Sequence, residues 1–324
     1  METILKSGYV CHPQQLYTLR RVRVSEGKAK GTEIIEVSTA GGLQVDILPD
    51  AGLDIGQVRY KGTNVTFISK NGYDSPAAID PYELEFLNTF PGGLLYTCGL
   101  RTTGGPHWDG EEWQTQHGRY HGLPAEPVAV YEEGDTIIKG TVRETALFGC
   151  NLELKRTIRI PMLGADITVS DEITNVGFKD EEYAVLYHCN FGYPFISEKA
   201  HLELPADRKT SPRTPFAATG LGRETTFDVP TPCEEERVFF HENMDHKAAL
   251  VNESEHIRMD LSWSDSLPIL AHWRSMASSD YVCGLEPTNC YIMGRKHERE
   301  NGTLPKLQPF ETVKTQVKFC FETV

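Results

Sequence analysis

The chain has 324 residues, of which 39% are hydrophobic and 24% are charged, and its formal net charge is −14. This charge argues against nucleic acid and anionic membranes as partners, because both are bound through basic surfaces. No apolar run approaches the ~18 residues that a membrane span requires. The eight cysteines are widely spaced and the first residues lack the apolar region of a signal peptide. We therefore expect reduced thiols in a cytoplasmic protein.

In chain order, the N-terminal third predicts mainly strands. Alternating or β-branched runs indicate strands at residues 34–38, 42–48 and 65–69. Short helices are expected only near Pro13–Val22 and Pro81–Leu87. The segment Asp50–Gly56 is predicted to be a turn, and a structural role is favoured for its Asp54.

The next informative segment is Gln116–Gly122, which holds two histidines and an arginine flanked by glycines. If it is extended, His117, Arg119 and His121 face one way and suit a binding loop. Arginine binds carboxylates or vicinal hydroxyls, and histidine donates to ring or hydroxyl oxygens. The i,i+4 histidines also permit a metal site. We favour no metal, because the glycines oppose a helix and no nearby carboxylate supplies a third ligand.

The middle of the chain predicts a strand at 136–142, then a hairpin of strands 152–160 and 165–175. A further strand at 183–187 leads to His188. A lone histidine in an apolar strand is more often structural than catalytic. However, Asn190 lies two residues on and shares its face, and Gly192-Tyr193-Pro194 closes the strand at a rim, where ligands bind. His188 is therefore a candidate proton-transfer group and Asn190 a candidate binding residue.

The C-terminal third begins with a predicted long loop at 207–231 and an acidic, solvated Glu234–Arg237 segment. Strands are expected at 248–251, 256–262, 281–285 and 312–321. Trp273 is a candidate for stacking on a ligand ring. Glu286 ends an apolar run, where burial of a carboxylate is costly and raises its pKa towards the range of a general base. An exposed, salt-bridged glutamate is the alternative.

Many strands, few helices and frequent turns predict an all-β fold, a large antiparallel sandwich. No domain linker and no repeat of 20–50 residues is evident. We expect a single domain over residues 1–324.

Five ordered segments resemble the galactose mutarotase-like (aldose 1-epimerase) superfamily, and in particular its DUF4432 branch. They are Leu48–Ile55, Phe90–Leu100, His117–Arg119, Asp171–Gly177 leading to His188, and Gly284–Pro287. The resemblance implies a β-supersandwich with the site on one concave sheet. It implies an isomerase that needs no cofactor and that interconverts the α and β anomers of an aldose or sugar acid.

The resemblance also implies roles for individual residues. His188 matches the general acid that protonates the ring oxygen, Glu286 the general base, and His117 a substrate-binding histidine. Arg101 is the nearest candidate for the substrate-binding arginine, although its context differs. The altered segment His188–Gly192 suggests a substrate other than galactose.

Three alternatives stay open at this point. The first is a non-catalytic carbohydrate-binding or regulatory protein on the same scaffold. The second is a carbohydrate lyase or hydrolase, and the third is a metal-dependent sugar isomerase that uses His117 and His121. In each case the partner is a small carbohydrate, and the oligomeric state is not readable from the sequence.

Overall fold

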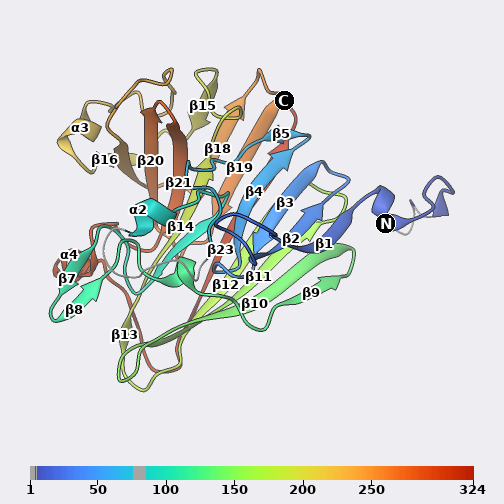
Figure 1. The fold of residues 1–324 in the computed structure, drawn as a ribbon. Helices are drawn as coiled ribbons and strands as arrows, with labels where there is room; N and C mark the ends of the chain where they lie inside the picture. Colours follow the sequence, from blue (N-terminus) through green and yellow to red (C-terminus); the bar gives the residue numbers. More distant parts are fainter. Residues whose placement is uncertain (1–3, 5, 76–84) are drawn as a thin grey trace.

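The structure is a computed structural model that describes residue 4 and residues 6–75 and 85–324. Its strands form three principal antiparallel sheets (Figure 1). The five-stranded sheet consists, in spatial order, of β1 (Thr18–Arg23), β2 (Glu33–Ser38), β3 (Leu43–Leu48), β4 (Asp54–Tyr60) and β5 (Thr63–Asn64). The predicted all-β sandwich is confirmed.

The eight-stranded sheet carries the longest strands. Its spatial order is β15 (Ala200–Glu203), β18 (Lys247–Asn252), β19 (Ile257–Trp263), β23 (Thr312–Glu322), β12 (Asp166–Asn175), β11 (Asn151–Pro161), β10 (Asp135–Thr145) and β9 (Ala129–Glu132). In β10, β11 and β12 buried side chains largely alternate with more exposed ones. This alternation is typical of a sheet with one face on the core and one in solvent.

The six-stranded sheet carries the candidate site. Its spatial order is β16 (Lys209–Pro212), β17 (Arg237–Glu242), β20 (Ile269–Ala277), β21 (Asp280–Thr288), β14 (Ala184–Phe191) and β6 (Tyr96–Leu100). Every residue of β14 is buried. This strand is covered on both faces, which explains its nearly continuous apolar sequence.

The remaining elements are small. The pairs β13 (Glu181–Glu182) with β22 (Lys306–Leu307) and β7 (His107–Asp109) with β8 (Glu112–Gln114) form two-stranded sheets. The helices are the 3₁₀ turns η1 (Pro13–Gln15) and η3 (Tyr120–Gly122), and the α-helices α2 (Glu85–Thr89), α3 (Pro215–Ala218) and α4 (Arg295–Glu300).

Some predicted elements differ from the structure. The helix expected at Pro13–Val22 is wrong beyond η1, because Thr18–Arg23 pairs with β2 as an antiparallel strand. Residues 65–69 make only isolated bridges, such as Thr66 with Phe191. The loop expected at 207–231 contains β16 and α3. The helix expected at Pro81–Leu87 lies partly outside the described residues, and its described part falls in α2.

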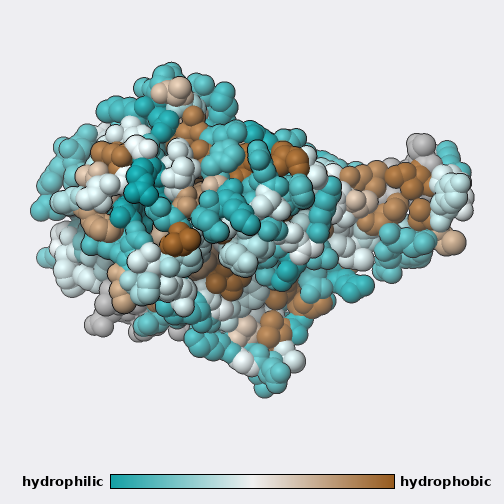
Figure 2. All heavy atoms as spheres, turned by 90° about the horizontal axis from the view of Figure 1, so that it is seen from above, coloured by the Kyte–Doolittle hydropathy of each residue, from teal (hydrophilic) through white to brown (hydrophobic). Residues whose placement is uncertain are grey.

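One hydrophobic core joins the three principal sheets, since it contains Ile47 of β3, Ile158 of β11 and Tyr187 of β14. The N-terminal segment projects from this body (Figure 2). None of the helices in the described part of the chain is long and apolar enough to cross a lipid bilayer.

A charged cluster lies inside this core. The guanidinium of Arg156, on β11, is fully buried and contacts the carboxylates of Asp54 and Asp171. Its Nε and Nη2 donate to the two Asp171 oxygens at 3.0 and 2.7 Å, and Nη2 donates to Thr97 Oγ1 at 2.9 Å. Tyr187 on β14 donates to Asp171 Oδ2 at 2.7 Å. This cluster therefore ties the eight-stranded sheet to the site-bearing sheet.

Candidate functional site

A cleft of about 880 Å³ opens on the six-stranded sheet. Its floor consists of side chains from β14, β21, β20 and β17. Its walls come from the segments around residues 67–71, 86–90, 105–107, 116–117, 213–214 and 292–293. Four residues predicted for the site line this cleft: His188, Glu286, His117 and Trp273.

His188 and Glu286 lie together on the floor. The pairing of β14 with β21 sets Cys189 against Leu285, which places His188 opposite Glu286 on the cleft face. His188 Nε2 lies 3.2 Å from Glu286 Oε1. The side chains are only 7% and 1% exposed. Two groups that can each hold a proton therefore meet at the base of the cleft.

The surroundings leave this pair poorly solvated. Burial lowers the pKa of His188 to about 4. Burial also raises the pKa of Glu286 well above its ordinary value, an effect that nearby Arg213 opposes and Glu236 strengthens. Among the described residues, His188 Nδ1 and Glu286 Oε1 have no hydrogen-bond partner. Unsatisfied buried polar atoms are costly, and such atoms at a cleft mark a place where a ligand can supply the missing contacts.

Gly284 makes room for the carboxylate. It precedes Glu286 by two residues on the same face of β21, and it lies opposite Trp273 of β20. A Cβ at Gly284 would lie 2.5 Å from Glu286 Oε1 and 3.1 Å from Trp273 Cβ. Any larger residue there would displace the Glu286 side chain, so the glycine is a local requirement of the site.

Aromatic rings surround the pair. The ring centroids of Phe90 and Trp273 each lie 5.3 Å from that of His188. His117 lies 6.0 Å from His188 and 5.0 Å from Phe86. Burial lowers the pKa of His117 well below its ordinary value, so this imidazole is neutral at physiological pH. Neutral imidazole and aromatic faces suit a polyhydroxyl ring, which presents both C–H faces and hydroxyl groups.

Sequence reasoning missed a polar chain across the cleft. Arg213, which follows β16, forms an ion pair of 2.8 Å with Glu236. Glu236 also accepts a hydrogen bond of 2.7 Å from the indole nitrogen of Trp273. The expectation that Glu234–Arg237 is simply a solvated acidic face is wrong, because Glu234 and Glu236 both line the cleft. No local pattern signals this role, since it depends on the pairing of β16 with β17 and of β17 with β20.

Two predicted binding residues lie behind the cleft wall. His121 is buried, and its ring stacks on Tyr96 at a centroid distance of 4.9 Å. Asn190 is fully buried, and its side chain donates to the backbone carbonyls of Gly93 and His188, each at 2.9 Å. Asn190 thus braces the strand that carries His188, and neither residue lines the cleft.

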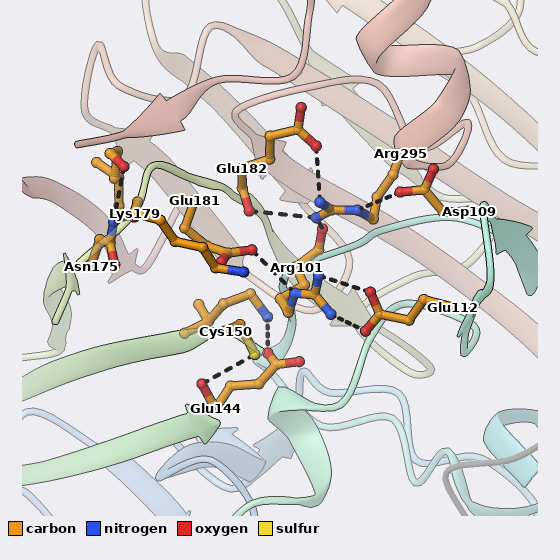
Figure 3. A network of polar contacts seen from close by, with 12 residues as sticks. Arg101, Asp109, Glu112, Glu144, Cys150, Asn175, Lys179, Glu181, Glu182 and Arg295 are labelled. Carbon is orange, nitrogen blue, oxygen red and sulfur yellow. Dashed lines mark hydrogen bonds and ion pairs between the residues drawn. The ribbon is translucent and has the colours of Figure 1, made fainter. Parts of the chain in front are cut away.

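The structure does not bring the two predicted arginines into the cleft. Arg119 is exposed and lies where the chain enters η3. The expected extended geometry fails because His117 has a positive φ of 56° and residues 120–122 form a 3₁₀ turn. Arg101 is held away by carboxylates: it contacts both oxygens of Glu112 and lies 3.4 Å from Glu181 (Figure 3).

The network around Arg101 is structural in character. Beside it, Arg295 of α4 pairs with Asp109 at 3.1 Å and with Glu182 at 2.9 Å (Figure 3). These contacts attach α4 to the two-stranded sheets β7–β8 and β13–β22. Among the described residues, no group of three or more His, Cys, Asp or Glu side chains is arranged to hold a metal ion.

The comparison with protein families agrees with the fold. The model of DUF4432, a domain of unknown function, matches residues 29–320. The chain belongs to the DUF4432 family. The resemblance predicted from the sequence is confirmed at this level. No curated protein matches the chain.

Several solved structures share the fold of this chain. A "putative aldose 1-epimerase" from Klebsiella pneumoniae superposes with a TM-score of 0.87 at 24% identity, covering 94% of this chain and 83% of its own. A galactose mutarotase-like protein from Clostridium acetobutylicum gives 0.67 at 15% identity, covering 96% and 100%. The galactose 1-epimerase from Lactobacillus acidophilus gives 0.63 at 16% identity, covering 94% and 99%. The DUF4432 chain thus has the mutarotase-like sandwich fold.

Proposed function

We propose that this protein is an aldose 1-epimerase-type isomerase, which interconverts the α and β anomers of a sugar in the cleft. The observation that carries the proposal is the contact of 3.2 Å between His188 Nε2 and Glu286 Oε1 on the cleft floor. The names of the solved neighbours support the same reaction class, since two of them are called epimerases.

The reaction needs one proton donor and one proton acceptor at neighbouring oxygens. A sugar hemiacetal opens when its C1 hydroxyl loses a proton while its ring oxygen gains one. A His–Glu pair that shares a single proton supplies both functions. Glu286 accepts the hydroxyl proton and His188 donates to the ring oxygen. The C1–C2 bond then rotates, and both transfers reverse on closure to give the opposite anomer, with no net gain or loss of protons.

The burial of the pair determines which of the two groups holds the proton before the sugar binds. In water the two groups would differ in pKa by about two units. Here burial lowers the pKa of His188 and raises that of Glu286, so the single shared proton lies on Glu286 in the free cleft. The proposed roles require this proton to pass to His188 when the sugar binds, which leaves Glu286 as the carboxylate that accepts the hydroxyl proton. A substrate that inserts its two oxygens between the side chains provides the hydrogen bonds that the free protein leaves unmade.

The test is the rate of anomeric exchange, measured by saturation-transfer NMR over a panel of aldoses and uronic acids. We expect acceleration of at least one sugar. General acid–base assistance contributes roughly 10²–10⁴-fold, so His188→Ala and Glu286→Gln each lose about that factor with little change in sugar binding. His121→Asn, which alters a buried histidine behind the cleft wall, is the matched control and keeps most activity. Binding without any acceleration would favour a sugar sensor and overturn the proposal.

A further inference from the structure

The cleft is longer than one sugar ring. On β21, Glu286 and Asp280 lie six residues apart, and both line the cleft. Six residues of extended strand span roughly 20 Å. A six-membered ring of ~1.5 Å bonds is, with its hydroxyl oxygens, roughly 6 Å across. A monosaccharide at the His188–Glu286 pair therefore fills one end of the cleft and leaves the rest open.

The open part is continuous with the site and runs along β20 and β21. The register sets Ala271 opposite Glu286, Trp273 opposite Gly284, and Ala277 opposite Asp280. Alternate residues of a strand share a face, so Trp273, Ser275 and Ala277 follow one another along the floor, and all three line the cleft. We call the part from Trp273 to Asp280 the outer trough.

The charges of the outer trough are balanced in pairs. Arg213 lies 2.8 Å from Glu236, and Lys70 lies 2.7 Å from Asp280. An anionic ligand would have to displace a carboxylate from its cation. A neutral saccharide unit fits without displacement, because its hydroxyls accept from the cations and donate to the carboxylates. The face of Trp273 beside these groups offers an apolar surface for a ring.

We propose that the outer trough binds a second, uncharged sugar unit, so that the substrate is the reducing end of a disaccharide or longer oligosaccharide. This inference rests on the proposed epimerase function. The reducing residue lies at the His188–Glu286 pair, and the next residue lies along the outer trough between the two ion pairs. The anomeric carbon of the reducing residue stays the only reacting centre.

The test compares each accelerated monosaccharide with reducing disaccharides that end in the same residue, with several linkages for each. We expect kcat/KM for at least one disaccharide to exceed that of its monosaccharide by roughly 10-fold. Ala277→Trp, at the far end of the floor, should remove that advantage and leave the monosaccharide rate within about 2-fold. Ser278→Trp places the same bulk one residue on, at an exposed turn position outside the cleft, and should leave both rates unchanged.

The outcomes separate the two proposals. If monosaccharides are accelerated but no disaccharide has a higher kcat/KM, the outer trough does not bind a second sugar unit. The epimerase function would then remain in place. If the Ala277→Trp variant keeps the higher kcat/KM for the disaccharide, the second sugar unit does not bind in the outer trough. No acceleration of any monosaccharide or disaccharide would overturn the epimerase function itself, and with it this inference.

Discussion

The two faces of β14 contact two buried sets of ionisable side chains, which differ in how completely they are hydrogen-bonded. Tyr187 points to the core, where it donates to Asp171 beside Arg156. The next residue, His188, points to the cleft and meets Glu286. In the core cluster each charged group has several hydrogen bonds. At the cleft, by contrast, both members of the His188–Glu286 pair have an atom without a hydrogen-bond partner among the described residues, as does His107.

This difference is also visible in the pKa values of the two groups of side chains. Arg156 is buried, which by itself lowers its pKa, yet Asp171, Tyr120 and Asp54 together keep that pKa well above the ordinary value. The guanidinium of Arg156 therefore keeps its charge at physiological pH. At the His188–Glu286 pair burial outweighs the opposing effects of its neighbours, so it shifts both pKa values in favour of the neutral side chains. Burial of an ionisable side chain therefore does not by itself indicate a functional site. Burial at a cleft without hydrogen-bond partners does indicate one.

The largest effect is expected from breaking the core cluster. Arg156→Ala leaves Asp54 and Asp171 buried without their cation, and removing one partner of a buried pair costs about 3–5 kcal/mol. The free energy of unfolding in urea measures this loss. Arg159→Ala, on the same strand, breaks an exposed pair with Asp135 and should cost less than about 1 kcal/mol. Similar losses of unfolding free energy in the two variants would show that the buried cluster contributes no more to stability than an exposed ion pair.

At the cleft we expect the opposite sign: replacing the ionisable carboxylate of Glu286 stabilises the protein. The folded pKa of Glu286 is raised, so its contribution to stability is fully present below the unfolded pKa and is lost as pH rises through the folded pKa. Glu286→Gln does not titrate. The variant should therefore gain stability relative to the parent as pH rises above ~4.3, by about 1.4 kcal/mol per unit of pKa shift.

Melting temperatures between pH 4.5 and 8 measure this trend. The control is Glu172→Gln, which removes a half-exposed carboxylate paired with Lys314 at 2.8 Å. The pKa of Glu172 is lowered by its hydrogen bond to Lys314, so its contribution to stability is already complete above ~4.3. This variant should therefore be less stable than the parent by under about 1 kcal/mol, with little dependence on pH across this range. A pH-independent difference for Glu286→Gln would show that its carboxylate is not held in the folded state with a raised pKa.

The sequence alone predicted the His188–Glu286 pair, His117 and Trp273, but not the polar chain across the cleft. His188 and Glu286 are polar residues in apolar strands, and that contrast is visible locally. Arg213 and Glu236 lie in polar segments without any such contrast, and only strand pairing brings them to the cleft. His121 and Arg119 were placed wrongly in the cleft because the chain turns at His117, a conformation with positive φ that residue type alone did not indicate.

A smaller effect should follow from filling the space beside the carboxylate. Gly284→Ala introduces a Cβ 2.5 Å from Glu286 Oε1, the far end of a flexible side chain, which can move aside. Stability should change by no more than about 1 kcal/mol, whereas a displaced catalytic group reduces kcat by roughly 10–100-fold. Gly105→Ala is the control, since it also lines the cleft but has no atom within 4 Å of its Cβ. Equal activities of the two variants would show that the site does not require a glycine at position 284.

The smallest effect concerns the polar chain that leads from the pair into the outer trough. Trp273→Phe keeps an aromatic ring on the cleft floor but removes the N–H that donates to Glu236 at 2.7 Å. A net hydrogen bond contributes about 0.5–1.5 kcal/mol, so KM should rise about 2–10-fold while kcat changes little, because Glu236 is separate from the proton transfers. Trp108→Phe alters an exposed tryptophan outside the cleft and should leave both constants unchanged. A fall in kcat without a rise in KM would instead place Trp273 with the reacting pair, through its ring contact of 5.3 Å with His188.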